Sequence, residues 1–351
     1  MTADQDGSRV EDVRIDEVVR RDRRGGRAGT TIEDVARAAG VSRQTVTRAM
    51  NDMVGISAVT KSRVLAAAKD LHYRPSRFGR GLARATHDTL GLVVADLTNP
   101  YYPEFAAALV RYAGSLGWNV VLVDTVHAQD RDRVLTGLAS QVDAVIGYLG
   151  RAGTWAEPLA GMTVVSVDPP VDGLLPRTSA VRLDPRPAMR EAAAHLAAVG
   201  VRDVVVVDGD VQGKVSERAR AVEAALGQVG VRARIVNAGA QEVEAGRAVT
   251  RRLVEEGLPD AVFAWNDILA VGALATFTER GISVPADVRL VGIDGLSLGT
   301  FVTPQLTTLA VDMAEVARQA VDLAVAALDP AGPAEPEVRH VRHVFTPRGS
   351  A

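Results

Sequence analysis

Apolar and polar residues recur with a helical period in residues 31–51, which read TIEDVARAAGVSRQTVTRAMN. Thr31 and Asp34 have the spacing of a helix-capping box, and Gly40 marks the end of a first helix. Ser42 is a suitable N-cap for a second helix. The small or apolar side chains of both helices fall on inward faces, namely those of Val35, Ala36, Ala39, Val46, Ala49 and Met50. The pattern predicts two short helices joined by a tight turn, followed by a third helix that Thr60 caps.

The outward face of the second helix carries Arg43, Gln44, Thr47 and Arg48. Arginine pairs well with guanine and glutamine with adenine in the major groove of DNA. A helix-turn-helix presents such side chains near the N-terminus of its second helix. Residues 29–75 are therefore predicted to form a helix-turn-helix domain that binds double-stranded DNA.

From residue 89 onward the period changes, and short runs of valine, isoleucine and leucine alternate with amphipathic helical segments. This alternation indicates parallel sheets with helices on both faces. The units are too numerous for one sheet, so residues 87–351 are predicted to form an α/β core of two Rossmann-like lobes.

The chain is expected to cross between these lobes three times, after residues 168–183, near residues 304–309 and after residue 328. The first lobe then holds about residues 87–168 and 309–329, and the second about 169–308 and 330–349. The helix at 311–329 is expected in the first lobe and a late strand within 338–347 in the second.

Composition and charge refine this picture. The chain has 351 residues, and 47% of them are hydrophobic, which is ample for a buried core. It contains no cysteine, which excludes disulfides and thiolate metal sites. Neither a signal sequence nor an apolar run of membrane length is apparent, so we expect a cytoplasmic protein that does not bind membranes.

Charge is distributed unevenly along the chain. Residues 1–30 carry seven basic and seven acidic side chains, and residues 31–86 carry ten basic and four acidic ones, a net +6. Since the whole chain has a net charge of −3, the remainder carries −9. A basic head on an acidic body suits a head that meets phosphate.

Two further segments flank the predicted head. Residues 1–28 have scattered charge and few large apolar groups, so we expect a disordered arm. Pro75 ends the third helix, and residues 76–83 (SRFGRGLA) form a short segment with two glycines. Residues 76–86 are therefore expected to be a hinge and linker that is mostly unfolded in isolation.

Residues 31–83 together resemble, without a gap, the head and hinge of the LacI/GalR family of transcriptional repressors. The resemblance implies that Arg43, Gln44 and Arg48 read bases and that Leu82 wedges into the minor groove at the centre of a palindromic operator. It implies phosphate contacts for Ser42, Thr45, Thr47 and Asn51. The other predicted DNA contacts are Thr31, Tyr73, Arg77 and Ala83.

Polar and aromatic side chains follow several predicted strands, where the cleft of an α/β protein lies. They are Tyr101, Tyr102, Asp168, Trp265, Asn266 and Asp294, and Arg220 lies near the start of its helix. Carboxylates, an amide and a guanidinium beside aromatic rings suit a small polyol. The alternative is that each Asp or Asn caps the helix it precedes, which we favour for Asp184 and Asp267.

The core also resembles the periplasmic-binding-protein type I fold, and that resemblance implies a sugar-type effector at these seven residues. The histidines show no metal-binding spacing, and Asp208-Gly209-Asp210 reads as a turn, so neither a metal nor a cofactor is expected.

The sequence thus predicts a ligand-responsive repressor of carbohydrate-utilisation genes that binds a palindromic operator as a homodimer and is released by a sugar-type inducer. A nucleoside or purine effector, or a corepressor, remains an alternative. A sugar solute-binding protein is a further one, although the DNA-binding head argues against it. An enzyme is not expected, because GxGxxG and P-loop motifs are missing and the Ser, His and Asp residues show no arrangement that suggests a nucleophile.

Overall fold

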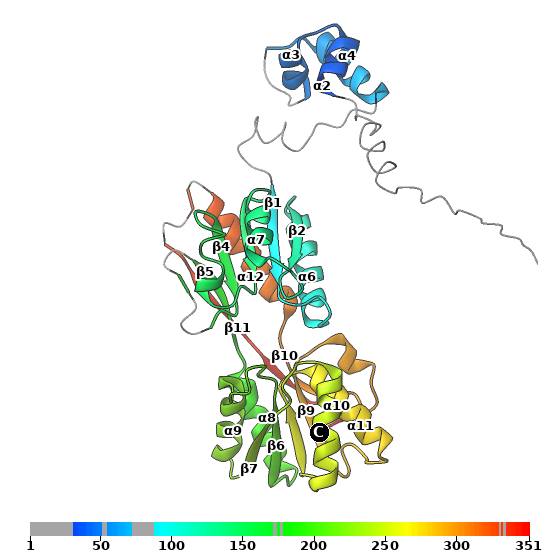
Figure 1. Ribbon diagram of the computed structural model, residues 1–351, viewed down its shortest axis with the longest axis vertical. Helices are drawn as coiled ribbons and strands as arrows, with labels where there is room; N and C mark the ends of the chain where they lie inside the picture. Colours follow the sequence, from blue (N-terminus) through cyan, green and yellow to red (C-terminus); the bar gives the residue numbers. More distant parts are fainter. Residues whose placement is uncertain are drawn as a thin grey trace, which may run out of the picture. The chain divides into compact units, whose positions relative to one another are not determined.

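The computed structural model describes residues 31–50, 55–71, 88–170, 174–175, 178–329, 331–332 and 335–351 (Figure 1). The chain divides into two compact units, Met1–His87 and Asp88–Ala351. The predicted arm and the predicted hinge lie outside the described residues. Within the part of the chain that is described, no helix is both long and apolar enough to cross a membrane.

Three helices form the described part of the first unit: α2 (Ile32–Ala39), α3 (Arg43–Met50) and α4 (Ala58–Asp70). The capping box between Thr31 and Asp34 is present, and Gly40 ends α2 in the left-handed conformation with φ 63°. The core of this unit is small, as its largest fully buried side chains are valines; its buried members are Val35, Ala36, Ala39, Val46, Ala49, Val64 and Ala68.

The predicted cap of the third helix is wrong. Ser57 caps α4, and its Oγ accepts a hydrogen bond from the Thr60 backbone N–H at 3.2 Å. Both residues are good capping types, and the helix begins at the earlier one because Ser57 has the extended backbone that an N-cap needs.

The first lobe of the second unit is built on a parallel six-stranded sheet with the order β11-β5-β4-β3-β1-β2. Its strands are β1 (Thr89–Val94), β2 (Asn119–Asp124), β3 (Ala144–Gly147), β4 (Thr163–Val167), β5 (Ser179–Asp184) and β11 (Val338–Arg342). Helices α6 (Tyr101–Ser115) and α12 (Met313–Leu328) pack in one apolar cluster with the sheet, and α7 (Arg131–Ala139) packs in another. Short 3-10 helices follow at η2 (Ala152–Thr154) in this lobe and η3 (Ser297–Thr300) in the other.

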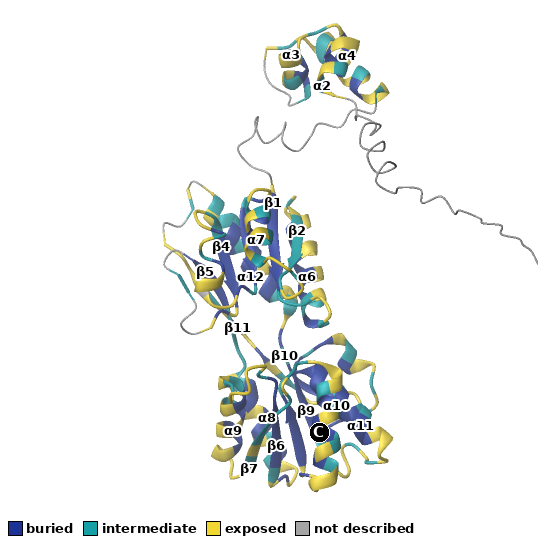
Figure 2. Ribbon diagram, viewed as in Figure 1, coloured by how far each residue is buried: buried dark blue, intermediate teal, exposed yellow. Residues whose placement is uncertain are grey.

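The second lobe repeats this plan with the order β12-β10-β9-β8-β6-β7, in which only the edge strand β12 is antiparallel. Its strands are β6 (Asp203–Asp208), β7 (Arg232–Asn237), β8 (Ala261–Ala264), β9 (Arg289–Asp294), β10 (Thr307–Ala310) and β12 (Val344–Thr346). Helices α8 (Arg186–Ala198) and α9 (Glu217–Gln228) share one buried cluster, and α10 (Val243–Glu256) and α11 (Asp267–Glu279) share the other. The central strands are buried on both faces (Figure 2).

The lobes are joined by three crossings, at β5 to α8, β10 to α12 and β11 to β12. Two expected lobe boundaries are therefore wrong. Strand β5 was not predicted, and it belongs to the first sheet although residues 169–308 were assigned to the second lobe. The third crossing lies at His343 rather than soon after residue 328, because β11 pairs with β5. Periodicity marks a segment as a strand but does not tell which sheet edge it joins.

Candidate functional site

A cavity of about 190 Å³ lies at the carboxyl ends of strands from both lobes. Parallel strands end at one edge of their sheet, so residues distant in sequence converge there. Six of the seven predicted effector residues line it: Tyr101, Tyr102, Asp168, Trp265, Asn266 and Asp294. The other lining residues are Asn99, Tyr148, Leu183, Arg218, Gln241 and His343.

The arginine at this cavity is Arg218 and not the predicted Arg220. Ser216 caps α9, so Arg218 lies in its first turn and reaches the cavity, whereas Arg220 is exposed. Side chains two positions apart on an α-helix point in directions that differ by about 200°, so Arg218 and Arg220 face opposite sides of α9. The Arg218 guanidinium lies 4.4 Å from the centroid of the Trp265 ring and donates through Nη1 to the Trp265 carbonyl at 3.1 Å.

Two carboxyl groups face the cavity from opposite lobes. Asp168 directly follows β4 and has φ 46°, and Asp294 ends β9 with φ 118°. Positive φ is uncommon for residues other than glycine and occurs where local structure holds a functional side chain in place. Asp294 is buried, and Asp168 keeps contact with solvent although protein atoms surround it on most sides.

Desolvation raises the pKa of both carboxyl groups, and the nearby Arg218 charge opposes that shift. The effect is stronger at Asp294, where the pKa lies well above its usual range because that group is fully enclosed and is close to Asp267. The Arg218 guanidinium therefore supports the ionised form of both acids.

Three tyrosines form one wall of the cavity. Tyr101, Tyr102 and Tyr148 meet edge to face, with ring centroids 5.3 to 5.6 Å apart. The Tyr101 and Tyr148 hydroxyls share a hydrogen bond of 2.6 Å. Burial raises the pKa of all three phenols, that of Tyr102 to about 12, so they stay protonated at neutral pH. The wall offers apolar ring surface with hydroxyl groups that are neutral.

Asn266 serves both roles that the sequence left open. Its Oδ1 accepts from the Leu269 backbone N–H at 2.9 Å and so caps α11, while the residue also lines the cavity. Asp267 is fully buried and does not cap the helix. It accepts from the Leu296 N–H at 2.7 Å and the Thr308 hydroxyl at 2.6 Å. Asp184 is not the cap of α8, because Pro185 is the N-cap; the Asp184 carboxylate lies one residue earlier and accepts from the Arg186 N–H at 3.1 Å.

The cavity therefore combines carboxylates, amides and one guanidinium with aromatic faces. Such a set can accept from and donate to adjacent hydroxyls while the rings cover an apolar C–H face. Nothing in this set is arranged as a nucleophile with a general base, since the phenols are protonated and the lining contains no serine, cysteine or lysine.

Sequence reasoning missed Tyr148, Gln241 and His343. Tyr148 directly follows β3 and could have been found by the rule that polar residues after strands line the cleft. Gln241 lies in the loop before α10 and donates to the Gly209 carbonyl at 3.1 Å. His343 lines the cavity because the third crossing lies at that residue, whereas the sequence predicted the crossing soon after residue 328.

The two lobes also contact each other directly, through Ser297 and Leu296 of the second lobe. The Ser297 hydroxyl and backbone N–H in the second lobe donate to Glu104 Oε1 of α6 at 2.6 and 3.1 Å. Leu296, one residue earlier, is buried in the apolar cluster of the first lobe. The relative position of the lobes is thus set by polar and apolar contacts at once.

The exposed face of α3 is the candidate DNA contact. Ser42, Arg43, Gln44 and Arg48 are exposed, and Thr31 is exposed at the start of α2. Thr45 and Thr47 are half-buried, and the Thr47 hydroxyl donates to the Arg43 carbonyl at 3.2 Å. The predicted contacts Asn51, Tyr73, Arg77, Leu82 and Ala83 lie outside the described residues.

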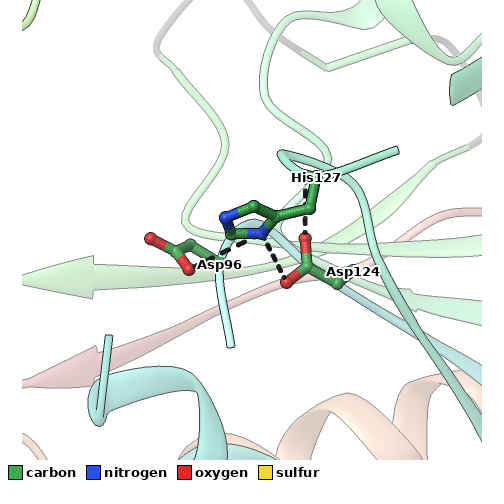
Figure 3. A group of neighbouring side chains, drawn as sticks. All are labelled: Asp96, Asp124 and His127. Atoms are coloured by element: carbon green, nitrogen blue, oxygen red, sulfur yellow. Dashed lines mark hydrogen bonds and ion pairs between the residues drawn. The ribbon is translucent and has the colours of Figure 1, made fainter. Parts of the chain in front are cut away.

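A separate polar cluster of Asp96, Asp124 and His127 lies at the ends of β1 and β2 (Figure 3). His127 Nδ1 lies 3.2 Å from Asp124 Oδ2 and 4.0 Å from Asp96 Oδ1. Asp124 also accepts from the backbone N–H groups of Leu97 and Val126, at 2.9 and 3.0 Å. These carboxylates therefore hold two loops together, which accounts for the cluster without a metal.

Both units of the chain match families of known proteins. Residues 31–76 match the family model described as bacterial regulatory proteins, lacI family, and residues 193–351 match a periplasmic binding protein-like domain. Catabolite control protein A of Priestia megaterium is 30% identical over 301 residues, which cover 84% of this chain and 91% of that protein. The ribose operon repressor of Halalkalibacterium halodurans is 31% identical over 284 residues, covering 80% of this chain and 85% of that one.

Among solved structures, a LacI family transcriptional regulator from Arthrobacter sp. FB24 in complex with lactose is 32% identical, with a TM-score of 0.67. The match covers 75% of this chain and 98% of that chain. The resemblance seen in the sequence and the predicted fold class are thereby confirmed, and the family is one of DNA-binding transcription regulators rather than enzymes. The chain belongs to the lacI family of bacterial regulatory proteins.

Proposed function

We propose that this regulator represses carbohydrate-utilisation genes as a homodimer on a palindromic operator and that a small sugar-type inducer releases it. The observation that carries the sugar proposal is the cavity between the lobes, where Asp168, Asp294 and Arg218 lie beside three tyrosines. Paired acceptors and a forked donor match adjacent hydroxyls, and the rings match a C–H face. The lactose complex of the Arthrobacter regulator supports the same class of ligand.

Coupling between the two sites follows from how the lobes are joined. A ligand that contacts Asp168 in one lobe and Asp294 in the other favours one arrangement of the lobes over another. Allostery requires only that the ligand and the operator prefer different arrangements. An inducer weakens operator binding, and a corepressor would strengthen it.

On the DNA side, we propose that Arg43, Gln44 and Arg48 contact base edges and that Thr31, Ser42, Thr45 and Thr47 contact phosphates. Asn51, Tyr73, Arg77, Leu82 and Ala83 complete the proposed contacts, with Leu82 as the wedge at the operator centre. A wedge in the minor groove needs two copies on a two-fold operator, which is the reason for a homodimer.

The test of the whole proposal is a fluorescence-anisotropy titration of the full chain on a library of symmetric duplexes. It is repeated at fixed salt with pentoses, hexoses, disaccharides and nucleosides. We expect one palindrome to bind and one sugar to weaken binding by about tenfold or more, a coupling of roughly 1.4 kcal/mol. A nucleoside that acts instead, or a compound that strengthens binding, would refute the sugar or the inducer part.

The base-reading assignment has a matched control within the same domain. Arg43 and Arg37 have similarly exposed side chains, 72% and 79%, and each pairs with an acid of α2. Arg43→Gln should weaken binding to the selected palindrome by about 1–3 kcal/mol and relax its base preference. Arg37→Gln removes the same charge and should leave base preference unchanged. Equal effects of the two variants would refute base reading by Arg43.

A further inference from the structure

His343 occupies the third crossing between the lobes. It is the single residue between β11, which joins the first sheet, and β12, which joins the second. Its backbone N–H donates to the carbonyl of Asp184 at 3.1 Å, and Asp184 precedes the first crossing. The backbone of His343 is therefore fixed to two of the three connections between the lobes.

The His343 side chain lines the cavity, and one of its two ring nitrogens lacks a protein partner. The residue is only 5% exposed, and its Nδ1 atom is buried without a hydrogen bond. Buried polar atoms in native proteins are nearly always paired, because leaving one unpaired after its removal from water costs free energy. A partner from the cavity would remove that cost.

The ring is neutral under physiological conditions. Burial and the nearby Arg218 charge lower the pKa of His343 to about 4. A neutral imidazole has one nitrogen that donates and one that accepts. It can therefore pair with a hydroxyl, which also donates and accepts, and it adds no charge to the cavity.

The charges that surround the ring limit the class of ligand. The ionisable lining consists of Asp168, Asp294, Arg218 and His343 together with the protonated tyrosines. Arg218 is the one cation among these groups and already faces the two carboxyl groups, so this lining leaves no unpaired cation for the phosphate of a phosphorylated sugar. An uncharged polyol needs no such cation.

We propose that His343 is a specificity-determining residue of the effector cavity, and that its imidazole exchanges a hydrogen bond with a hydroxyl of an uncharged sugar. The proposal rests on the proposed sugar effector. It assigns to the third crossing a direct contact with the ligand, so that occupancy of the cavity is sensed at a connection between the lobes.

His195 provides a matched control. It also has a buried ring nitrogen, Nε2, without a hydrogen-bond partner. However, its ring lies 5.3 Å from that of Phe345 in the second lobe and is not part of the cavity lining. Loss of a buried imidazole can thus be compared inside and outside the cavity.

The experiment uses the full chain and begins with a melting-temperature screen of D-ribose, D-galactose, D-glucose, lactose, cellobiose and glucose 6-phosphate. Isothermal titration calorimetry then measures the affinity for the sugar that binds. The proteins compared are the wild type, His343→Leu, His343→Asn, His343→Gln and His195→Leu. We expect an uncharged sugar to bind and His343→Leu to weaken it by about tenfold, equivalent to roughly 1.4 kcal/mol. Asn or Gln, which restores a nitrogen at the Nδ1 or Nε2 position, should recover most of the affinity.

Operator affinity without sugar and the melting temperature of the free protein separate this contact from a structural role. The loss of sugar affinity in His343→Leu should exceed any change in these two quantities, and His195→Leu should leave sugar affinity unchanged. Sugar affinity that is equal in His343→Leu and wild type would overturn the inference and leave the proposed function standing. If operator binding is intact and no sugar binds, the sugar effector is overturned and the inference with it.

A measurement on the wild type covers the case in which His343→Leu does not fold. Two-bond proton–nitrogen NMR spectra report the state of each imidazole nitrogen. Addition of the bound sugar should shift the nitrogens of His343 and leave those of His195 in place. An unshifted His343 in the sugar complex would overturn the assignment.

Discussion

Replacing Arg218 by methionine removes the cation of the effector cavity while keeping much of the aliphatic length of the side chain. Arg220→Met is the matched control, because it makes the same change two residues along α9 at an exposed position. Arg218 donates to the Trp265 carbonyl at 3.1 Å and lies over the Trp265 ring. The two variants therefore remove the same charge, but only Arg218→Met removes it from the cavity together with the contacts to Trp265.

The magnitude follows from the contacts that are lost. A hydrogen bond from a charged donor to a ligand hydroxyl contributes about 1.5–3 kcal/mol, so sugar affinity should fall by roughly 10- to 150-fold in Arg218→Met. The lost bond and the lost cation–π contact to Trp265 should also lower the free energy of unfolding by about 1–2 kcal/mol. Arg220→Met should do neither.

A second consequence of the same change needs no ligand. Arg218 lowers the pKa of Asp168 and of Asp294 against the effect of desolvation. Removing it should therefore raise the pKa of both carboxyl groups, which carbon-13 NMR titration of the side chains measures. Arg220→Met should leave both values in place.

Calorimetry with the bound sugar and the carboxyl titration test independently whether Arg218 acts on the ligand and on the two acids. The reasoning is refuted if Arg220→Met weakens sugar binding as much as Arg218→Met. It is refuted equally if both variants titrate like the wild type, since the guanidinium would then not act on either acid.

Three further outcomes are expected. Burial raises the pKa of Asp267 from 3.8 to about 7, so the folded state holds a proton that the unfolded state releases. The contribution of Asp267 to the free energy of unfolding in urea, taken as the difference between the wild type and Asp267→Asn, should therefore fall by up to about 1.4 kcal/mol per pH unit as pH rises from about 4 to 7. A difference that stays constant or rises over this range would contradict the assignment. A Cβ at Gly272 would fall against a backbone carbonyl of α10, whereas one at Gly137 meets nothing within 4 Å. Gly272→Ala should thus cost about 1–3 kcal/mol and Gly137→Ala should not, and equal melting temperatures would exclude this packing. In a double-mutant cycle, Glu104→Ala and Ser297→Ala should couple by about 1 kcal/mol in the free energy of unfolding, and strict additivity would show that their bond is not formed in solution.

Local sequence was sufficient to identify the helix-turn-helix. Its signals act over three or four residues: the Thr31–Asp34 capping box, the left-handed Gly40 and the alternation of inward and outward side chains. The start of α4 was the exception, because Ser57 and Thr60 are equally good caps and only the backbone conformation at Ser57 distinguishes them.

The sequence also determined most of the candidate cavity. Asp168, Asn266 and Asp294 could be found because the carboxyl ends of parallel strands meet at one edge of a sheet, whatever the details of packing. That rule applies to side chains that directly follow a strand. It does not extend to the first turn of α9, where one helical phase selects Arg218 and the opposite phase Arg220.

Only the tertiary structure decided which sheet each late strand joins. Strands β11 and β12 are separated by a single residue, yet they pair with β5 and β10 in different lobes. Such pairing joins segments more than 150 residues apart in one case, and neither composition nor period records it. The position of His343 in the cavity depends on that pairing, which is why a residue without any motif around it became visible only once both lobes were assembled.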